Sequence, residues 1–152
     1  MKDFSDKGSK MQENELKGIT ENSTSQTTKD ILATTTDERL LHVYAYNYNW
    51  DDGFEILKII LKNPVCSLST ALLMFYWCDG YYYLLHRSTS SNDTEWYAFI
   101  NELYHNIING VYKKTNIAFE QPLSKVQIHQ LKKTLTEKEM ILLTPIDGEQ
   151  II

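Results

Sequence analysis

The chain has 152 residues, of which 42% are hydrophobic and 23% charged, a composition typical of a globular domain and not of a fibrous or wholly disordered protein. Twenty acidic and fifteen basic residues give a formal charge of −5, which is the wrong sign for a protein whose main partner is a phosphate backbone. Two cysteines are too few for a disulfide scaffold, and no apolar run approaches the roughly 18 residues that a membrane span needs. We therefore expect neither a nucleic-acid partner nor a membrane partner.

The two ends of the chain differ in composition from its centre. Residues 1–30 are rich in Lys, Glu, Ser, Thr, Asn and Gln, and cannot bury enough apolar surface to offset their ordering entropy. We expect a disordered tail there, a single helical domain over residues 36–143, and a frayed tail over residues 144–152, where Pro145 and Gly148 lie. The first segment has no apolar stretch or cleavage site of a secretory signal, so we expect a cytoplasmic protein with reduced cysteines.

Residues able to cap a helix precede the first two apolar clusters of the domain. Thr36 precedes an apolar stripe that ends at Tyr48, with the three- and four-residue spacing of one helix face. Asp52 followed by Glu55 is a variant capping box, with Asp in place of Ser or Thr, and predicts a second helix. Asn63-Pro64 ends that helix, because a residue before proline is pushed out of the α region.

Four further segments follow in the expected domain. Ser67 or Ser69 begins a helix that is apolar nearly all round and ends at Asp79-Gly80, so it belongs in the centre of the fold. A short aromatic span, 81–85, and a polar loop follow. Apolar residues from Trp96 to Val111 recur at helical spacing and predict the longest helix.

The C-terminal region repeats the capping pattern. After an extended or loop segment at 117–119, Ser124 with Gln127 and Thr136 with Glu139 form two capping boxes, each opening a short helix. No alternating strand pair is present in the sequence. The expected fold is all-α, a compact irregular bundle of about six helices, in which the unit around Asn63-Pro64 could also be one helical hairpin of a solenoid.

The string Asn49-Trp50-Asp51-Asp52-Gly53-Phe54-Glu55 is the most specific motif of the chain. Together with several other segments, it resembles a family of small bacterial proteins catalogued as domain of unknown function 4274, and the likeness spans about residues 38–135. Similar proteins often carry a proline soon after Phe54-Glu55-Ile56 and an acidic residue at position 67, where this chain has Leu57-Lys58 and Ser67. The resemblance implies a bacterial helical domain and brings no catalytic residue with it. The other segments that carry it are 46–48, 63–68, 70–76, 79–81 and 117–128.

Two sets of residues have the chemistry of metal ligands or catalytic groups. Asp51, Asp52 and Glu55 could hold a divalent cation, but two of them also suit the start of a helix, so we expect capping and no metal. Cysteines and histidines supply zinc-ligand types, although no compact zinc spacing joins them, and we expect the cysteines to be buried hydrophobes. Cys78 paired with His86 as a nucleophile has no oxyanion donors in the sequence to support it. The four cysteine and histidine residues are Cys66, Cys78, His86 and His105.

Aromatic residues are in excess of what one small core needs. They fall in two clusters, and amphipathic aromatics at a surface can anchor an interface because they offer large area at low entropic cost. Core packing with hydroxyls reaching the surface is the alternative. We expect the partner-binding residues to be Tyr48, Trp50, Asp51, Asp52, Asp79 and Tyr81. The two clusters are Tyr44, Tyr46, Tyr48 and Trp50, and Tyr76, Trp77, Tyr81, Tyr82 and Tyr83.

These features favour a cytoplasmic, non-enzymatic protein-binding module without a cofactor. The sharpest version is an immunity or antitoxin protein that neutralises a co-encoded basic effector, with carboxylates steering the partner and aromatic anchors closing its active cleft. A metal-dependent hydrolase using Asp51, Asp52 and Glu55, or a helical scaffold domain, remains the alternative. The sequence leaves the oligomeric state open.

Overall fold

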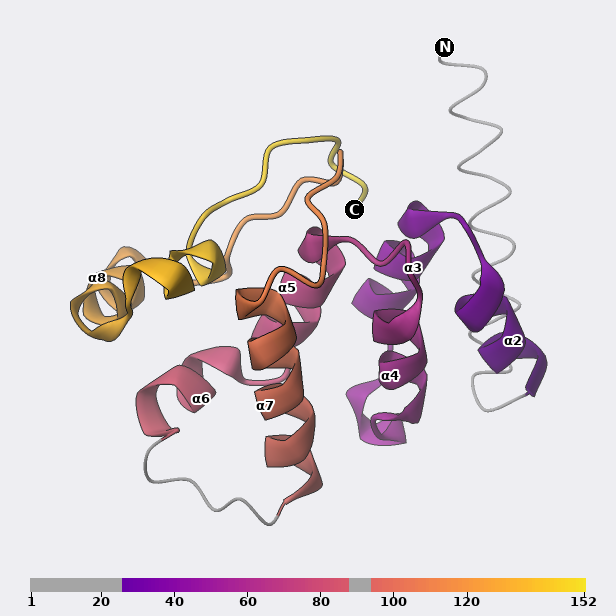
Figure 1. Cartoon of the computed structure of the whole chain (residues 1–152), viewed down its shortest axis with the longest axis horizontal. Coiled ribbons are helices and arrows are strands. Elements are labelled where there is room, and N and C mark those ends of the chain that lie inside the picture. Colours follow the sequence, from indigo (N-terminus) through magenta and orange to yellow (C-terminus); the bar gives the residue numbers. More distant parts are fainter. Residues whose placement is uncertain (1–25, 88–93) are drawn as a thin grey trace. The chain divides into compact units, whose positions relative to one another are not determined.

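The computed structural model describes residues 26–87 and 94–152 (Figure 1). The chain divides into two compact units: unit 1 contains the residues up to Cys66 together with Ile152, and unit 2 is Ser67–Ile151. Seven α-helices and two 3-10 helices, and no strands, lie in these described ranges. The all-α prediction is confirmed, whereas the helices of the predicted single domain fall into two units. No helix in the described part of the chain is long and apolar enough to cross a membrane.

Unit 1 begins with a helix that composition did not reveal. α2 (Gln26–Thr34) takes in residues 26–30, which we assigned to the disordered tail, so that part of the prediction is wrong. The physical reason is tertiary: Leu32 is fully buried, and the Asn63 side-chain amide donates to the carbonyl oxygens of Leu32 and Thr35, both at 2.9 Å. Residues 1–25, the rest of the predicted tail, lie outside the described residues.

α3 (Glu38–Asn47) follows, and its first turn is capped by Asp37 and not by Thr36. The Asp37 carboxylate accepts from the backbone N–H groups of Arg39 and Leu40, at 3.0 and 3.4 Å. These two bonds satisfy donors that a helix N-terminus otherwise leaves without partners.

The predicted capping box at Asp52 and Glu55 is absent. Asp52 instead ends a 3-10 helix, η1 (Trp50–Asp52), whose cap is the Asn49 side chain, accepting from Asp51 N at 3.1 Å. α4 (Glu55–Lys62) then begins without a side-chain cap. Gly53 between them has φ +87°, a conformation that other residues rarely adopt, and this turn takes Asp52 out of capping position.

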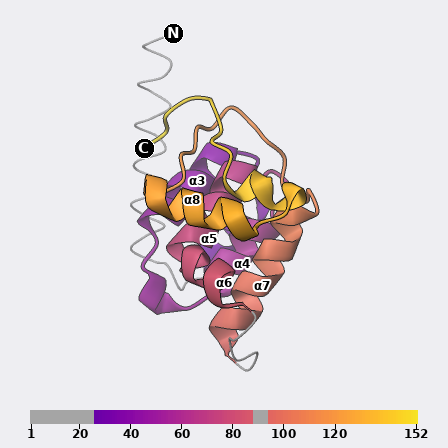
Figure 2. The same ribbon diagram turned by 90° about the vertical axis from the view of Figure 1, so that its left-hand side faces the viewer.

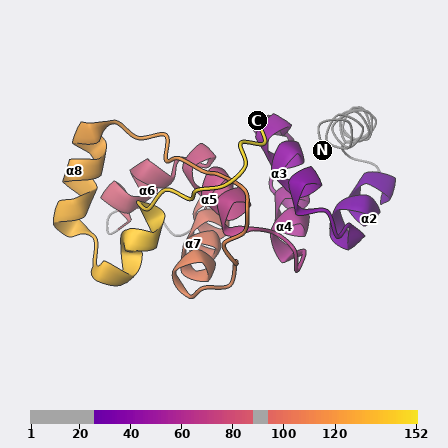
Figure 3. The same ribbon diagram turned by 90° about the horizontal axis from the view of Figure 1, so that it is seen from above.

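Unit 2 is built around α5 (Leu68–Trp77), which is buried nearly all round, as its sequence predicts. It packs on α6 (Gly80–His86) and α7 (Glu95–Ile108), and α7 confirms the helix predicted from Trp96 onward. The turn between α5 and α6 is very tight: a Cβ on Gly80 would lie 2.5 Å from the Phe75 ring. Figure 3 shows α8 (Lys125–Thr134) at one edge of this unit, beside α6.

The C-terminal segment is attached to the rest of unit 2 at several points, which corrects the prediction of a frayed tail. Phe119 and Ile146 exchange both backbone hydrogen bonds, at 2.9 and 2.8 Å, and Glu149 N donates to Asn116 O at 2.8 Å. The two loops consequently run side by side (Figures 1 and 2). Between α8 and this pairing lies η2 (Glu137–Leu142), the helix predicted to follow Thr136.

Candidate protein-binding surfaces

Four of the six predicted partner-binding residues form one group in unit 1, which we call the Trp50 group: Tyr48, Trp50, Asp51 and Asp52. The Trp50 ring lies edge-on to Tyr48 with centroids 6.1 Å apart, and the Tyr48 hydroxyl donates to Gly53 O at 2.8 Å. Tyr48 is buried, Trp50 is half-buried, and both carboxylates are exposed. The group therefore presents carboxylates beside an aromatic ring, with Tyr48 supporting that ring from below the surface.

The negative charge of Asp52 reaches the phenols behind Trp50. Burial, and then the Asp52 charge, raise the pKa of both Tyr44 and Tyr48 to about 12. Both phenols are therefore neutral at physiological pH and can act as hydrogen-bond donors. The Trp50 indole N–H is buried and has no hydrogen-bond partner within the described residues, which costs free energy in the folded chain.

The third carboxylate of the sequence cluster does not join the other two in a metal-binding group. Glu55 forms an ion pair with Lys29 of α2, at 2.8 Å between Nζ and Oε1. In the ranges that the structure describes, no three His, Cys, Asp or Glu side chains are placed to hold a metal ion together.

The other two predicted residues, Asp79 and Tyr81, belong to unit 2 and form a separate group. Asp79 is exposed and has φ 61° and ψ 42°, the one positive φ outside glycine in the described residues. Tyr81 is partly exposed, and its hydroxyl donates to the Gln130 side-chain oxygen of α8 at 2.7 Å. Tyr81 therefore already holds α8 at the edge of unit 2.

Both cysteines are buried and free, as expected of small hydrophobes. Burial raises the pKa of the Cys66 thiol to about 12, and burial together with the Asp79 charge does the same for Cys78. The thiolate is the nucleophilic form, so neither side chain is poised for covalent catalysis. His86 stacks on Tyr82 with centroids 4.2 Å apart, and its Nδ1 lies 3.1 Å from Tyr82 O.

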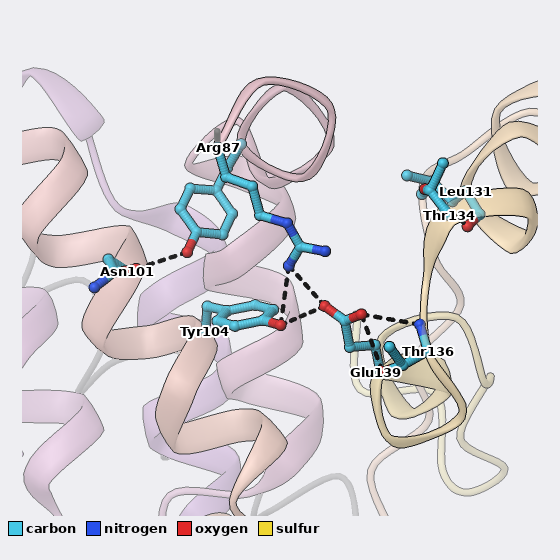
Figure 4. A network of polar contacts seen from close by, with 8 residues as sticks. Arg87, Asn101, Tyr104, Leu131, Thr134, Thr136 and Glu139 are labelled. Carbon is cyan, nitrogen blue, oxygen red and sulfur yellow. Dashed lines mark hydrogen bonds and ion pairs between the residues drawn. The ribbon is translucent and has the colours of Figure 1, made fainter. Parts of the chain in front are cut away.

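Sequence reasoning missed a polar network in the interior of unit 2 (Figure 4). Arg87 Nη1 lies 2.6 Å from Glu139 Oε2 and 2.9 Å from the Tyr104 hydroxyl, which itself donates to the same carboxylate oxygen. The other oxygen, Oε1, accepts from the backbone N–H and the hydroxyl of Thr136, at 2.9 and 3.1 Å. Only the capping pattern of Thr136 and Glu139 was visible in the sequence, because residues 17 to 52 positions apart give no local signal.

The network keeps Glu139 ionised although its side chain is only 6% exposed. Burial opposes ionisation, but the hydrogen bonds from Arg87, the Thr136 backbone and Tyr104 outweigh it and lower the pKa of Glu139 to about 2. The bond to Glu139 also raises the pKa of Arg87, and burial and the same carboxylate raise the pKa of Tyr104. Both carboxylate oxygens of Glu139 are hydrogen-bonded. We call the network of Arg87, Tyr104 and Glu139 the clamp, because it links the end of α6, α7 and η2.

Charge is distributed unevenly along the chain. Residues 113–138 contain six lysines and only two glutamates, and α8 carries Lys125, Lys132 and Lys133 with no acidic residue. All three of these lysines are exposed. The chain as a whole is negatively charged at −5, but the segment 113–138 is positively charged. An acidic binding surface would therefore be confined to a part of the chain such as the Trp50 group.

A family model described as a domain of unknown function (DUF4274) matches residues 36–108. This match confirms, over residues 36–108, the resemblance that the sequence motifs indicate. The DUF4274 match runs from the cap of α3 to the end of α7, so it contains all six predicted binding residues together with Arg87 and Tyr104. The 117–128 segment lies beyond the match, as does Glu139. No curated protein and no solved structure matches the chain.

Proposed function

We propose that this chain is a protein-binding module without catalytic activity of its own, and that it acts as a bacterial immunity or antitoxin protein. Its partner is a basic effector encoded by a neighbouring gene. The mechanism is occlusion: exposed carboxylates steer the basic partner, and an aromatic anchor fills part of its active cleft.

The observation that carries the proposal is the geometry of the Trp50 group. η1 places a half-buried indole next to two exposed carboxylates, and the Asn49 cap and the Tyr48–Gly53 bond hold this short helix in place. A preorganised aromatic side chain with adjacent charge loses little entropy on binding, which is what an interface hot spot requires.

The test is a growth-rescue and binding experiment with the product of the adjacent reading frame. Expression of that product alone should arrest growth, and co-expression of the wild-type chain should restore it. Trp50→Ala should lower the affinity about thirtyfold, in line with a loss of roughly 2 kcal/mol for a hot-spot residue, and should abolish rescue. Asp51→Asn/Asp52→Asn should slow association and weaken its dependence on salt.

Tyr46→Ala is the matched control, because Tyr46 is an aromatic residue of the same unit that is 40% exposed and lies outside the Trp50 group. It should bind and rescue like wild type. Circular dichroism must show that all variants are folded. If the neighbouring product binds Trp50→Ala as tightly as wild type, or binds neither protein, the proposal is wrong.

A further inference from the structure

Tyr82 on α6 is the most exposed aromatic residue of the described ranges, at 52%. Two neighbouring aromatic rings nonetheless pack against it. His86 stacks against it at 4.2 Å, and the Trp96 ring of α7 meets it at a steep angle with centroids 6.1 Å apart. An aromatic ring that is half in solvent and fixed by two neighbours needs little ordering when it binds a ligand.

The residue that follows the anchor point of this aromatic corner in the chain is an aspartate, Asp79. The Trp96 indole N–H donates to the carbonyl oxygen of Cys78 at 2.8 Å, which ties the indole to the residue that precedes Asp79. Asp79 is exposed, and its carboxylate makes no capping bond to α6 and no ion pair within the described residues. The backbone of Asp79 is left-handed, a conformation that only a few residues besides glycine tolerate.

The cation nearest in sequence to this corner is already engaged. Arg87, one residue beyond α6, is bound by Glu139 and Tyr104 and lies over the Tyr104 ring at 5.3 Å. The aromatic corner thus combines two aromatic rings, of which Tyr82 is half exposed and covered by His86 on one face, with a carboxylate that forms no ion pair within the described residues. A cation is attracted by both, since the face of an aromatic ring carries partial negative charge.

We propose that Tyr82, Trp96 and Asp79 form a second contact site, in unit 2, which receives a lysine or arginine side chain of the basic protein partner. This inference rests on the proposed function in one respect, namely that the cationic side chain belongs to a protein partner. Tyr82 and Trp96 supply the ring faces, and Asp79 supplies the counter-charge. The fit to a cationic side chain follows from these three residues alone.

The site can be tested without the effector, by NMR titration of the full ¹⁵N-labelled chain with a hexa-arginine peptide. The reporter is the Trp96 indole N–H resonance, assigned with a Trp96→Phe variant. We expect saturable shifts of this resonance. Tyr82→Leu keeps an apolar side chain and removes the ring, and should weaken binding about threefold, the size of an exposed cation–π contact. Asp79→Asn removes the charge and should weaken binding as well, because asparagine tolerates the left-handed backbone.

Tyr46→Leu in unit 1 is the matched control for the loss of an exposed tyrosine, and it should leave the titration unchanged. Equal affinity of Tyr82→Leu and wild type would overturn the site, as would binding of a hexa-glutamate peptide at the same resonance. Shifts by the hexa-arginine peptide that leave the Trp96 indole resonance unchanged would likewise count against this site. The titration contains no effector, so its outcome does not depend on the growth-rescue experiment. A negative titration would therefore refute only this second site, and a failed rescue would refute only the proposed function.

Discussion

Two aspartates of unit 1 show that the position of a carboxylate in the backbone, and not its identity, decides what it contributes to stability. Asp37 accepts from two N–H groups of the first turn of α3, whereas Asp52 caps no helix. We expect Asp37→Ala to lower the free energy of unfolding by about 1 kcal/mol, the usual value of an N-cap, and Asp52→Ala to change it by less than about 0.5 kcal/mol. Urea denaturation of the two variants measures this directly, and a larger loss at Asp52 would refute the cap assignment.

Position 80 requires glycine because there is no room for a side chain, whereas position 110 requires glycine because its backbone has a positive φ. A Cβ on Gly80 would lie 2.5 Å from the Phe75 ring and 2.6 Å from its carbonyl oxygen, while Gly110 has φ +75° and open space around it. We expect Gly80→Ala to cost about 1–3 kcal/mol through overpacking, and Gly110→Ala to cost about 1 kcal/mol through strain.

Asparagine separates the two causes. Because it tolerates the left-handed region, Gly110→Asn should be more stable than Gly110→Ala in thermal melts. Gly80→Asn should be no better than Gly80→Ala, since a larger side chain cannot relieve a steric conflict. Recovery of stability in Gly80→Asn would show that the contact with Phe75 is not what limits this position.

At the scale of elements, the clamp between α6, α7 and η2 should make unit 2 sensitive to acid. The pKa of Glu139 is about 2 in the folded chain and about 4.5 ordinarily, so its contribution is present above pH 4.5 and is lost as the pH falls from 4.5 toward 2. Glu139→Gln should lower stability by about 2 kcal/mol at pH 7, the value of a hydrogen bond to a charged group. The gap between variant and wild type should shrink through that pH window.

The comparison must be between wild type and variant, because His42 in unit 1 titrates in an adjoining pH range. Burial lowers the pKa of His42 in α3 to about 4 from 6.5, so protonation of the unfolded chain destabilises both proteins as the pH falls from 6.5 to 4. Subtraction cancels this effect. A gap that stays constant from pH 7 to pH 2 would mean that the Glu139 charge is unimportant to the clamp.

Elements with a strong local signal were predictable, and those that depend on distant partners were not. The apolar periods of α5 and α7 and the capping box at Ser124 and Gln127 are fully local, and the structure confirms them. α2 has few apolar residues and depends on Asn63, 31 positions away from Leu32. The clamp draws on three elements at once, so no spacing in the sequence could indicate it.

At the scale of the whole molecule, the limits of unit 1 can be located by two truncations. The composition of residues 1–25 predicts that their removal leaves the melting temperature almost unchanged. Removal of residues 1–34 also deletes Leu32, which is fully buried, and leaves the Asn63 amide without one of its acceptors. We expect a loss of at least about 2 kcal/mol in the second case only, from the lost core side chain alone. A similar loss in the first would show that the tail packs on the folded chain.

The predicted binding residues were only partly interpretable from sequence. The excess of aromatics was visible, but the division between core and surface was not: Tyr48 is buried and Tyr82 is exposed, although both lie in apolar stretches. Which ring faces solvent depends on how helices pack, and a single sequence does not encode that locally. The positive charge of the α8 surface was likewise not apparent from the net charge of the chain, which is negative.

The pairing of the two C-terminal loops has a consequence for biosynthesis. Tyr76 in α5 donates to the carbonyl of Leu142, and the backbone of Phe119 is paired with that of Ile146. A nascent chain that has emerged only as far as α7 therefore has α6 and α7 to pack on α5, the most buried helix of unit 2, but lacks the C-terminal partners of that helix. α5 stays incompletely covered until residues 142–149 have left the ribosome, and a stalled chain would display it to chaperones.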